Sequence, residues 1–138
     1  MILVMDLSYR PGSLSEAEFV APVDRIVRQE GHSTRVRHYL DLVPGDLASA
    51  GGAILCGTTL ADSGYRERME SFAWLPAFPG PVLGICAGMQ VIARAFGIPA
   101  GSVQILSGAT HARKRVRVGG VTREAALVLL GRILREGG

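Results

Sequence analysis

Three short stretches of nearly continuous apolar residues constrain this chain's fold more than any other feature of the sequence. They are the residues Ile2–Met5, Gly52–Cys56 and Val82–Ile85. Runs of this length, without polar alternation, are typical of strands buried on both faces. Segments with helical spacing of apolar residues lie between and after them. Strands that alternate with helices predict a mainly parallel sheet with helices on both faces, a three-layer α/β sandwich.

The remaining segments follow the same alternation. Ser13 or Ser15 is a suitable cap for a helix that ends at Gly31. Pro22 predicts that this helix either is kinked at Pro22 or begins only near Ala21. The other expected elements are, in chain order, a strand over Thr34–Leu40, a loop at Pro44-Gly45, a short polar helix over Tyr65–Phe72, a helix over Val91–Phe96 closed by Gly97, strands over Ser102–Leu106 and Arg115–Val118, and a final helix capped by Thr122.

Length and composition limit the classes of protein to consider. The chain has 138 residues, of which 48% are apolar and 20% charged, so we expect one globular domain over residues 1–138. It has no apolar run long enough for a membrane span, and its first residues have no secretory-signal pattern. Two cysteines make neither a disulfide scaffold nor a zinc site, so we expect a cytoplasmic protein with reduced thiols, no metal and no cofactor.

The basic residues are concentrated in the last quarter of the chain. Residues 106–138 hold seven basic and two acidic side chains, and four of the basic ones lie between Arg113 and Arg117. Such a run can bind phosphates. Aromatic residues are not interleaved with it, however, and arginine alternates with valine from Arg115 onward. This alternation favours a half-buried strand with a solvated face over a nucleic-acid site.

The strongest chemical motif directly follows the third apolar run. It reads Gly84-Ile85-Cys86-Ala87-Gly88, the Gly-x-Cys-x-Gly spacing of a nucleophile elbow. In such a turn the nucleophile is at the N-terminus of a helix, where the helix dipole favours the thiolate. The N–H of the next residue, here Ala87, points to where an oxyanion would form. A buried structural cysteine between two glycines is the alternative interpretation.

Around this motif the chain resembles a known family. Residues 81–93, from Pro81 to Ala93, are similar to the signature of class I (triad-type) glutamine amidotransferases, which have a flavodoxin-like sheet. The resemblance implies that Cys86 attacks the side-chain amide of glutamine and releases ammonia, with Ala87 supplying one oxyanion N–H. It also implies that Gln90 and Gly88 help to hold the substrate. Residues 52–59 resemble the family's oxyanion loop, in which Gly57 would lend the second N–H, although Cys56 and Thr58 replace the usual small residues.

The last third of the chain departs from the family. The His-x-Glu motif that completes the family's triad on a late strand has no match here, and the chain is shorter between Gly97 and Thr122 than is usual in the family. His111 is the one histidine after the cysteine motif and so the candidate base, but no carboxylate follows two residues later to orient it. Glu124 lies near the matching place, where capping of the final helix is its simpler role. His32 and His38 are interpreted as surface or structural residues.

Three functions therefore remain open. The first is a glutaminase that supplies ammonia to a partner synthase and is impaired on its own. The second is a catalytically inactive relative that binds a partner or ligand with the same surface. The third is a cysteine-elbow hydrolase of the intracellular-protease type, a group that usually has an acidic residue near the cysteine on the loop of the first strand, where Asp6 is the only candidate. Because the sheet is short, we also expect the chain to associate with itself.

Overall fold

The computed structural model describes residues 1–97 and, beyond them, two strands at 103–107 and 115–118. In chain order the elements are β1 (Ile2–Asp6), α1 (Leu14–Phe19), α2 (Ala21–Gln29), β2 (Thr34–His38), α3 (Pro44–Ser49), β3 (Gly52–Leu55), the 3₁₀ helices η1 (Gly64–Glu67), η2 (Met69–Phe72) and η3 (Leu75–Ala77), β4 (Val82–Gly84), α4 (Ala87–Ala95), β5 (Val103–Ser107) and β6 (Arg115–Val118).

The four strands of residues 1–97 form one parallel sheet, as the apolar runs predict. Their order is β2-β1-β3-β4, and every neighbouring pair is parallel. Leu3, Val4 and Met5 of the central strand β1 are completely buried, which is the expected state of a strand covered on both faces. All four carboxyl ends lie at the same edge of the sheet, the edge at which ligands bind in open α/β folds.

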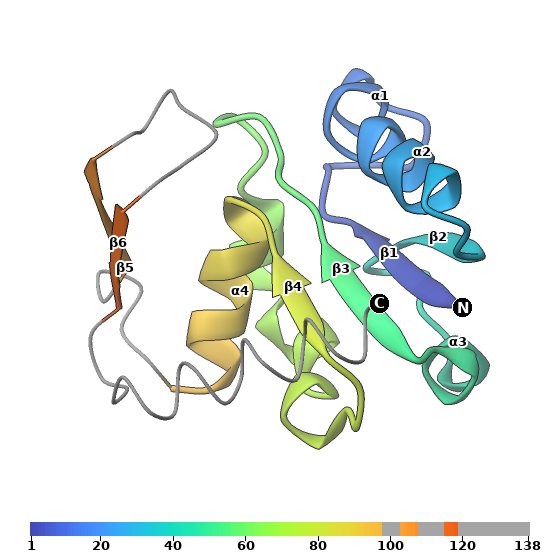
Figure 1. Ribbon diagram of the computed structural model, residues 1–138. Coiled ribbons are helices and arrows are strands. Elements are labelled where there is room, and N and C mark those ends of the chain that lie inside the picture. Colours follow the sequence, from blue (N-terminus) through green and yellow to red (C-terminus); the bar gives the residue numbers. More distant parts are fainter. Residues whose placement is uncertain (98–102, 108–114, 119–138) are drawn as a thin grey trace.

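Helices cover both faces of this sheet (Figure 1), so the three-layer α/β architecture is confirmed. On one face, Leu3, Met5 and Leu55 pack with residues of α4 and of the 3₁₀ helices, among them Val91 and Phe72. On the other face, Val4 and Cys56 pack with Val20 and Val23 of the α1–α2 segment. The side chains of β1 and β3 alternate between these two cores, as the period of two requires.

The first helical segment is divided, as Pro22 predicts. Ser13 caps α1, its Oγ accepting the N–H of Glu16 at 3.1 Å, and α2 begins at Ala21 with the proline in its first turn. A proline in the first helical turn loses no hydrogen bond, because the N–H groups there have no intrahelical acceptor. The chain therefore restarts a helix at this point instead of continuing one through the proline.

Two expectations for the middle of the chain were wrong. Pro44 and Gly45 begin the helix α3, and do not form a loop, because proline suits the first helical position and Asp46 accepts the N–H of Val43 at 3.2 Å. The predicted polar helix over Tyr65–Phe72 is instead two 3₁₀ helices, η1 and η2, and Tyr65 and Phe72 are buried against the α4 face of the sheet. Tertiary packing outweighed local polarity there.

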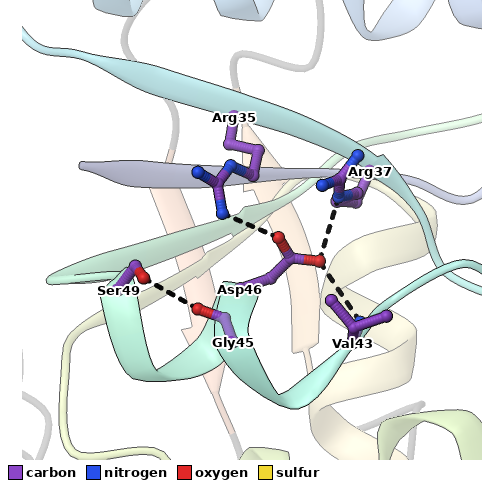
Figure 2. Close-up of polar contacts among 6 residues, drawn as sticks. All are labelled: Arg35, Arg37, Val43, Gly45, Asp46 and Ser49. Carbon is purple, nitrogen blue, oxygen red and sulfur yellow. Dashed lines mark hydrogen bonds and ion pairs between the residues drawn. The ribbon is translucent and has the colours of Figure 1, made fainter.

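Asp46 also joins α3 to the edge strand β2 (Figure 2). Its two carboxylate oxygens accept hydrogen bonds from Arg35 Nη1 and Arg37 Nε, each at 2.9 Å. Asp46 itself is only 1% exposed. Burial alone would raise the pKa of Asp46, but the hydrogen bonds from Arg37, Arg35 and the Val43 N–H outweigh it, so the pKa lies below its usual value.

The two strands beyond residue 97 form a separate antiparallel pair. β5 and β6 are hydrogen-bonded with an irregularity between Ile105 and Ser107, and they do not join the four-stranded sheet. Both strands lie close to the predicted ranges, so the strand interpretation of Arg115–Val118 is confirmed. Arg113, Lys114 and the predicted final helix are outside the described residues. No helix in the part that is described is long and apolar enough to cross a membrane.

Candidate active site

Cys86 occupies the sharp turn between β4 and α4, as the elbow motif predicts. Its backbone has φ 50° and ψ −106°, and it is the one non-glycine residue among those described with a positive φ. A side chain in this region of backbone space is strained, at a typical cost of about 1–3 kcal/mol. Strain of this kind persists only where the surrounding structure enforces it, which makes the turn a candidate for function.

The two glycines of the motif are required by close packing. A Cβ atom on Gly88 would lie 2.0 Å from the carbonyl oxygen of Leu55, and one on Gly84 would lie 2.6 Å from the backbone nitrogen of Met89. No real side chain tolerates such distances, so any substitution would push α4 away from β3 and β4. The Gly-x-Cys-x-Gly pattern is therefore a steric requirement of the turn that presents Cys86.

Cys86 directly precedes α4, and one backbone donor next to it, the N–H of Ala87, has no partner within residues 1–97. The carbonyl of Cys86 accepts the N–H groups of Met89 and Gln90, at 3.1 and 3.3 Å, while the residue itself is exposed. Within residues 1–97 the N–H of Ala87 donates to no acceptor. An unpaired N–H at the positive end of a nine-residue helix can stabilise an anion next to the sulfur.

Gly57, the predicted second oxyanion residue, lies directly beside this turn. A Cβ on Gly57 would be 3.3 Å from Cys86 Cβ and 3.5 Å from the carbonyl oxygen of Ile85. The loop after β3 and the turn after β4 are thus in contact at the carboxyl edge of the sheet. Gly57 is therefore buried against the Cys86 turn, at the position that the sequence resemblance assigns to the second oxyanion N–H.

Gln90, one helical turn after Cys86, is held by two residues that sequence reasoning missed. Its Oε1 accepts the hydroxyl of Tyr65 at 3.3 Å and Nη2 of Arg66 at 3.2 Å. Both donors belong to η1, which is predicted as part of an ordinary polar helix. No local pattern could have found them, because only the packing of η1 against α4 brings them to Gln90.

The second cysteine is chemically different from the first. Cys56 directly follows β3 and has no exposed surface. Burial, followed by the negative charges of Asp6 and Asp24, raises the pKa of the Cys56 thiol to about 12. The thiol therefore stays protonated at neutral pH, and since the thiolate is the nucleophile, Cys56 is a core residue.

Asp6 does not lie next to Cys86. It ends β1, which is separated from β4 by β3, so at about 4.8 Å per strand the two residues are about 10 Å apart along the sheet. Asp6 Oδ1 accepts the N–H of Ser8 at 2.8 Å, and its buried Oδ2 has no partner among the described residues. In the described part of the chain, neither carboxylate oxygen of Asp6 is hydrogen-bonded to Cys86.

Neither histidine within residues 1–97 is bonded to Cys86. His38 is buried on β2, where Nε2 donates to the carbonyl of Ser8 at 2.6 Å and Nδ1 accepts the N–H of Leu40 at 3.3 Å. β2 lies three strand spacings from β4, or about 14 Å. His32 precedes β2 and so lies toward the opposite edge. His38 is thus a structural residue, while His111 and Glu124 lie outside the described residues.

The described part of the chain offers no group of three or more histidine, cysteine or acidic residues that could hold a metal ion. Comparison of the chain with protein-family models and with curated proteins finds no match.

Proposed function

We propose that this chain is a cysteine-dependent amidotransferase of the class I glutamine type. In this proposal Cys86 hydrolyses the side-chain amide of glutamine, and the ammonia is passed to a partner synthase. One observation carries the proposal: an exposed cysteine at a strained positive φ, between a buried parallel strand and the N-terminus of a nine-residue helix. This is the geometry of a nucleophile elbow.

The chemistry would proceed in two steps. The Cys86 thiolate attacks the amide carbon, so that a C–S bond forms and the carbonyl electrons move to oxygen, facing the N–H of Ala87 and the loop at Gly57. The C–N bond then breaks, and ammonia leaves with an added proton. Water next attacks the glutamyl thioester, which releases glutamate and returns the proton to the sulfur.

Both steps need a group that delivers and removes protons. His38 is engaged with Ser8 on a distant strand, so the base comes from elsewhere, and His111 or a residue of the partner synthase is the candidate. A positioned base contributes about 10²–10⁴-fold to such a reaction. We therefore expect the isolated chain to be a slow glutaminase, with turnover below about 1 s⁻¹.

A catalytically inactive relative is the second candidate. It is favoured by the lack of any histidine bonded to Cys86 within residues 1–97. In this case glutamine, or a partner carrying a similar group, would bind at the Cys86 turn without being cleaved. The two proposals share the surface and differ in whether a C–S bond forms.

Measurement of ammonia release from saturating glutamine, with and without cell extract, tests the first proposal. We expect slow release that extract accelerates, that Cys86→Ser abolishes and that Cys56→Ala retains. A trapped glutamyl adduct on Cys86, seen by mass spectrometry, would support the enzyme even if the second step stalls. Release that persists in Cys86→Ser would contradict it, and glutamine binding without any adduct or release would favour the inactive relative.

A further inference from the structure

One face of α4 carries three functional groups in a row. Cys86, Gln90 and Arg94 are spaced four residues apart, so they follow one another along the same side of the helix. Arg66 of η1 reaches over this row: its Nη2 contacts Gln90 Oε1 at 3.2 Å, and its carbonyl accepts Nη1 of Arg94 at 3.5 Å. The exposed Cys86 thus stands at the end of a strip that contains two guanidinium groups.

The contacts of Gln90 determine what it can offer to a ligand. Oε1 receives two donors, from Tyr65 and Arg66, and so both of its lone pairs are used. The amide nitrogen has no partner among the described residues and remains a donor. A donor amide next to a guanidinium suits a ligand group that only accepts hydrogen bonds, such as a carboxylate.

Arg66 is placed to meet such an anion. Its side chain is exposed, and its guanidinium lies 5.9 Å from the centre of the Tyr65 ring, a stacking contact that limits its freedom. Among the described residues neither Arg66 nor Arg94 forms a salt bridge, in contrast to Arg28, Arg35 and Arg37. Positive charge without a carboxylate partner therefore accumulates along α4, one to two helical turns from Cys86.

The spacing fits the proposed substrate. Residues four apart on a helix have Cβ atoms roughly 5–6 Å apart, so Gln90 lies about this far from Cys86. The amide carbon of an extended glutamine is roughly 5 Å from its carboxyl carbon, at about 1.5 Å per bond along a zigzag chain. A substrate amide at the sulfur would thus bring its carboxylate to the Gln90–Arg66 pair.

We propose that Arg66, supported by Gln90, is the residue that selects a carboxylate-bearing substrate for Cys86. The inference rests on the proposed function, since it assumes that Cys86 reacts with the bound molecule. In it, Arg66 donates two N–H groups to the carboxylate while Gln90 donates its amide nitrogen. Arg94 adds charge behind Arg66 without touching the ligand.

Two matched electrophiles separate recognition from reactivity. 5-Chloro-4-oxopentanoate carries a carboxylate, and its methyl ester does not; the Cys86 thiolate displaces chloride from either one, forming a C–S bond. The ratio of the two alkylation rates at Cys86, measured by mass spectrometry, reports on the carboxylate alone. We expect the acid to react faster than the ester in the wild type, and Arg66→Gln to lower the ratio about tenfold. Arg66→Lys should retain an intermediate ratio.

Arg25→Gln is the control, because it removes the same charge from an exposed position on α2, on the other face of the sheet. It should leave the ratio unchanged. If Arg66→Gln alkylates with the ester at the wild-type rate, the variant is folded. If that variant does not fold, the wild-type ratio decides instead: it should fall as salt is raised from low to high concentration.

Each outcome has a distinct meaning. A ratio that is the same in the wild type and in Arg66→Gln, or a wild-type ratio that salt does not alter, overturns the role of Arg66 and leaves the proposed function standing. If neither electrophile alkylates Cys86, the proposed function itself fails. A ratio that falls as much in Arg25→Gln as in Arg66→Gln indicates a general charge effect and also overturns the specific role.

Discussion

The two ends of the parallel sheet use their polar groups in opposite ways. At the β2 end, the carboxylate of Asp46 is buried and accepts three donors, from Arg35, Arg37 and the N–H of Val43 (Figure 2). At the β4 end, Cys86 is exposed on a strained backbone, and the N–H of Ala87 donates to nothing within residues 1–97. At the β2 end the buried carboxylate has all of its hydrogen-bond partners, whereas at the β4 end a thiol and a backbone N–H remain available to a ligand.

This difference separates structure from function in physical terms. A buried charge is tolerated only where its partners are complete, so the Asp46 cluster is expected to matter for stability. An unsatisfied donor and a strained nucleophile cost stability and are useful only when a ligand arrives. Substitutions at the two ends should therefore change different measured quantities, and the following experiments test that division.

The largest expected effect is the difference in reactivity between the two cysteines. Brief treatment with iodoacetamide at pH 7.5 should label Cys86 about 100-fold faster than Cys56, or more, because Cys56 is buried and its pKa is raised to about 12. Peptide mass spectrometry after digestion measures both sites in one sample. Equal labelling, or labelling of Cys56 first, would contradict the assignment of Cys86 as the nucleophile.

Loss of the Asp46 carboxylate should produce the largest change in stability. Asp46→Asn removes charged hydrogen bonds to two arginines, and we expect the free energy of unfolding in urea to fall by about 2 kcal/mol. Asp41→Asn, at an exposed position nearby, is the control and should have little effect. The rate of Cys86 labelling should not change. Loss of reactivity in Asp46→Asn would show that the two ends are not independent.

The pH dependence of unfolding should report on the same carboxylate. Because the pKa of Asp46 is lowered on folding, its contribution is complete above the ordinary value of 3.8 and is lost as the pH falls through the lower folded-state pKa. We expect the wild type to lose more stability than Asp46→Asn between pH 5 and pH 2. Parallel curves for the two proteins would mean that Asp46 is not a source of the acid sensitivity.

The smallest expected effect is a gain in stability from a substitution of Cys86, at the β4 end of the sheet. Glycine adopts positive φ without strain, so Cys86→Gly should raise the free energy of unfolding by about 1 kcal/mol while abolishing thiol reactivity. Cys86→Ser, which keeps a Cβ atom at the strained position, should not be stabilised. A destabilised Cys86→Gly variant would argue that the turn is not strained and that the cysteine side chain contributes to packing.

Local patterns predicted the elements that depend on local physics. The buried strands follow from continuous apolar runs, the start of α1 from the Ser13 cap, and the break before α2 from Pro22. The Cys86 turn follows from two glycines whose backbone atoms are too close to their neighbours for a side chain. The strands, the cap and the break depend on residues within a few positions of one another, which the sequence displays directly. The glycines of the turn are visible as a motif, although the Leu55 backbone that Gly88 approaches belongs to another strand.

Tertiary structure decided everything that joins distant segments. The pairing of Asp46 with Arg35 and Arg37 depends on where α3 packs against the edge strand, and the contacts of Tyr65 and Arg66 with Gln90 depend on where η1 packs against α4. The strand order and the placement of the helices determine that Cys56 is buried and Cys86 is exposed. Such outcomes are set by the packing of whole elements, and no spacing along the chain encodes them.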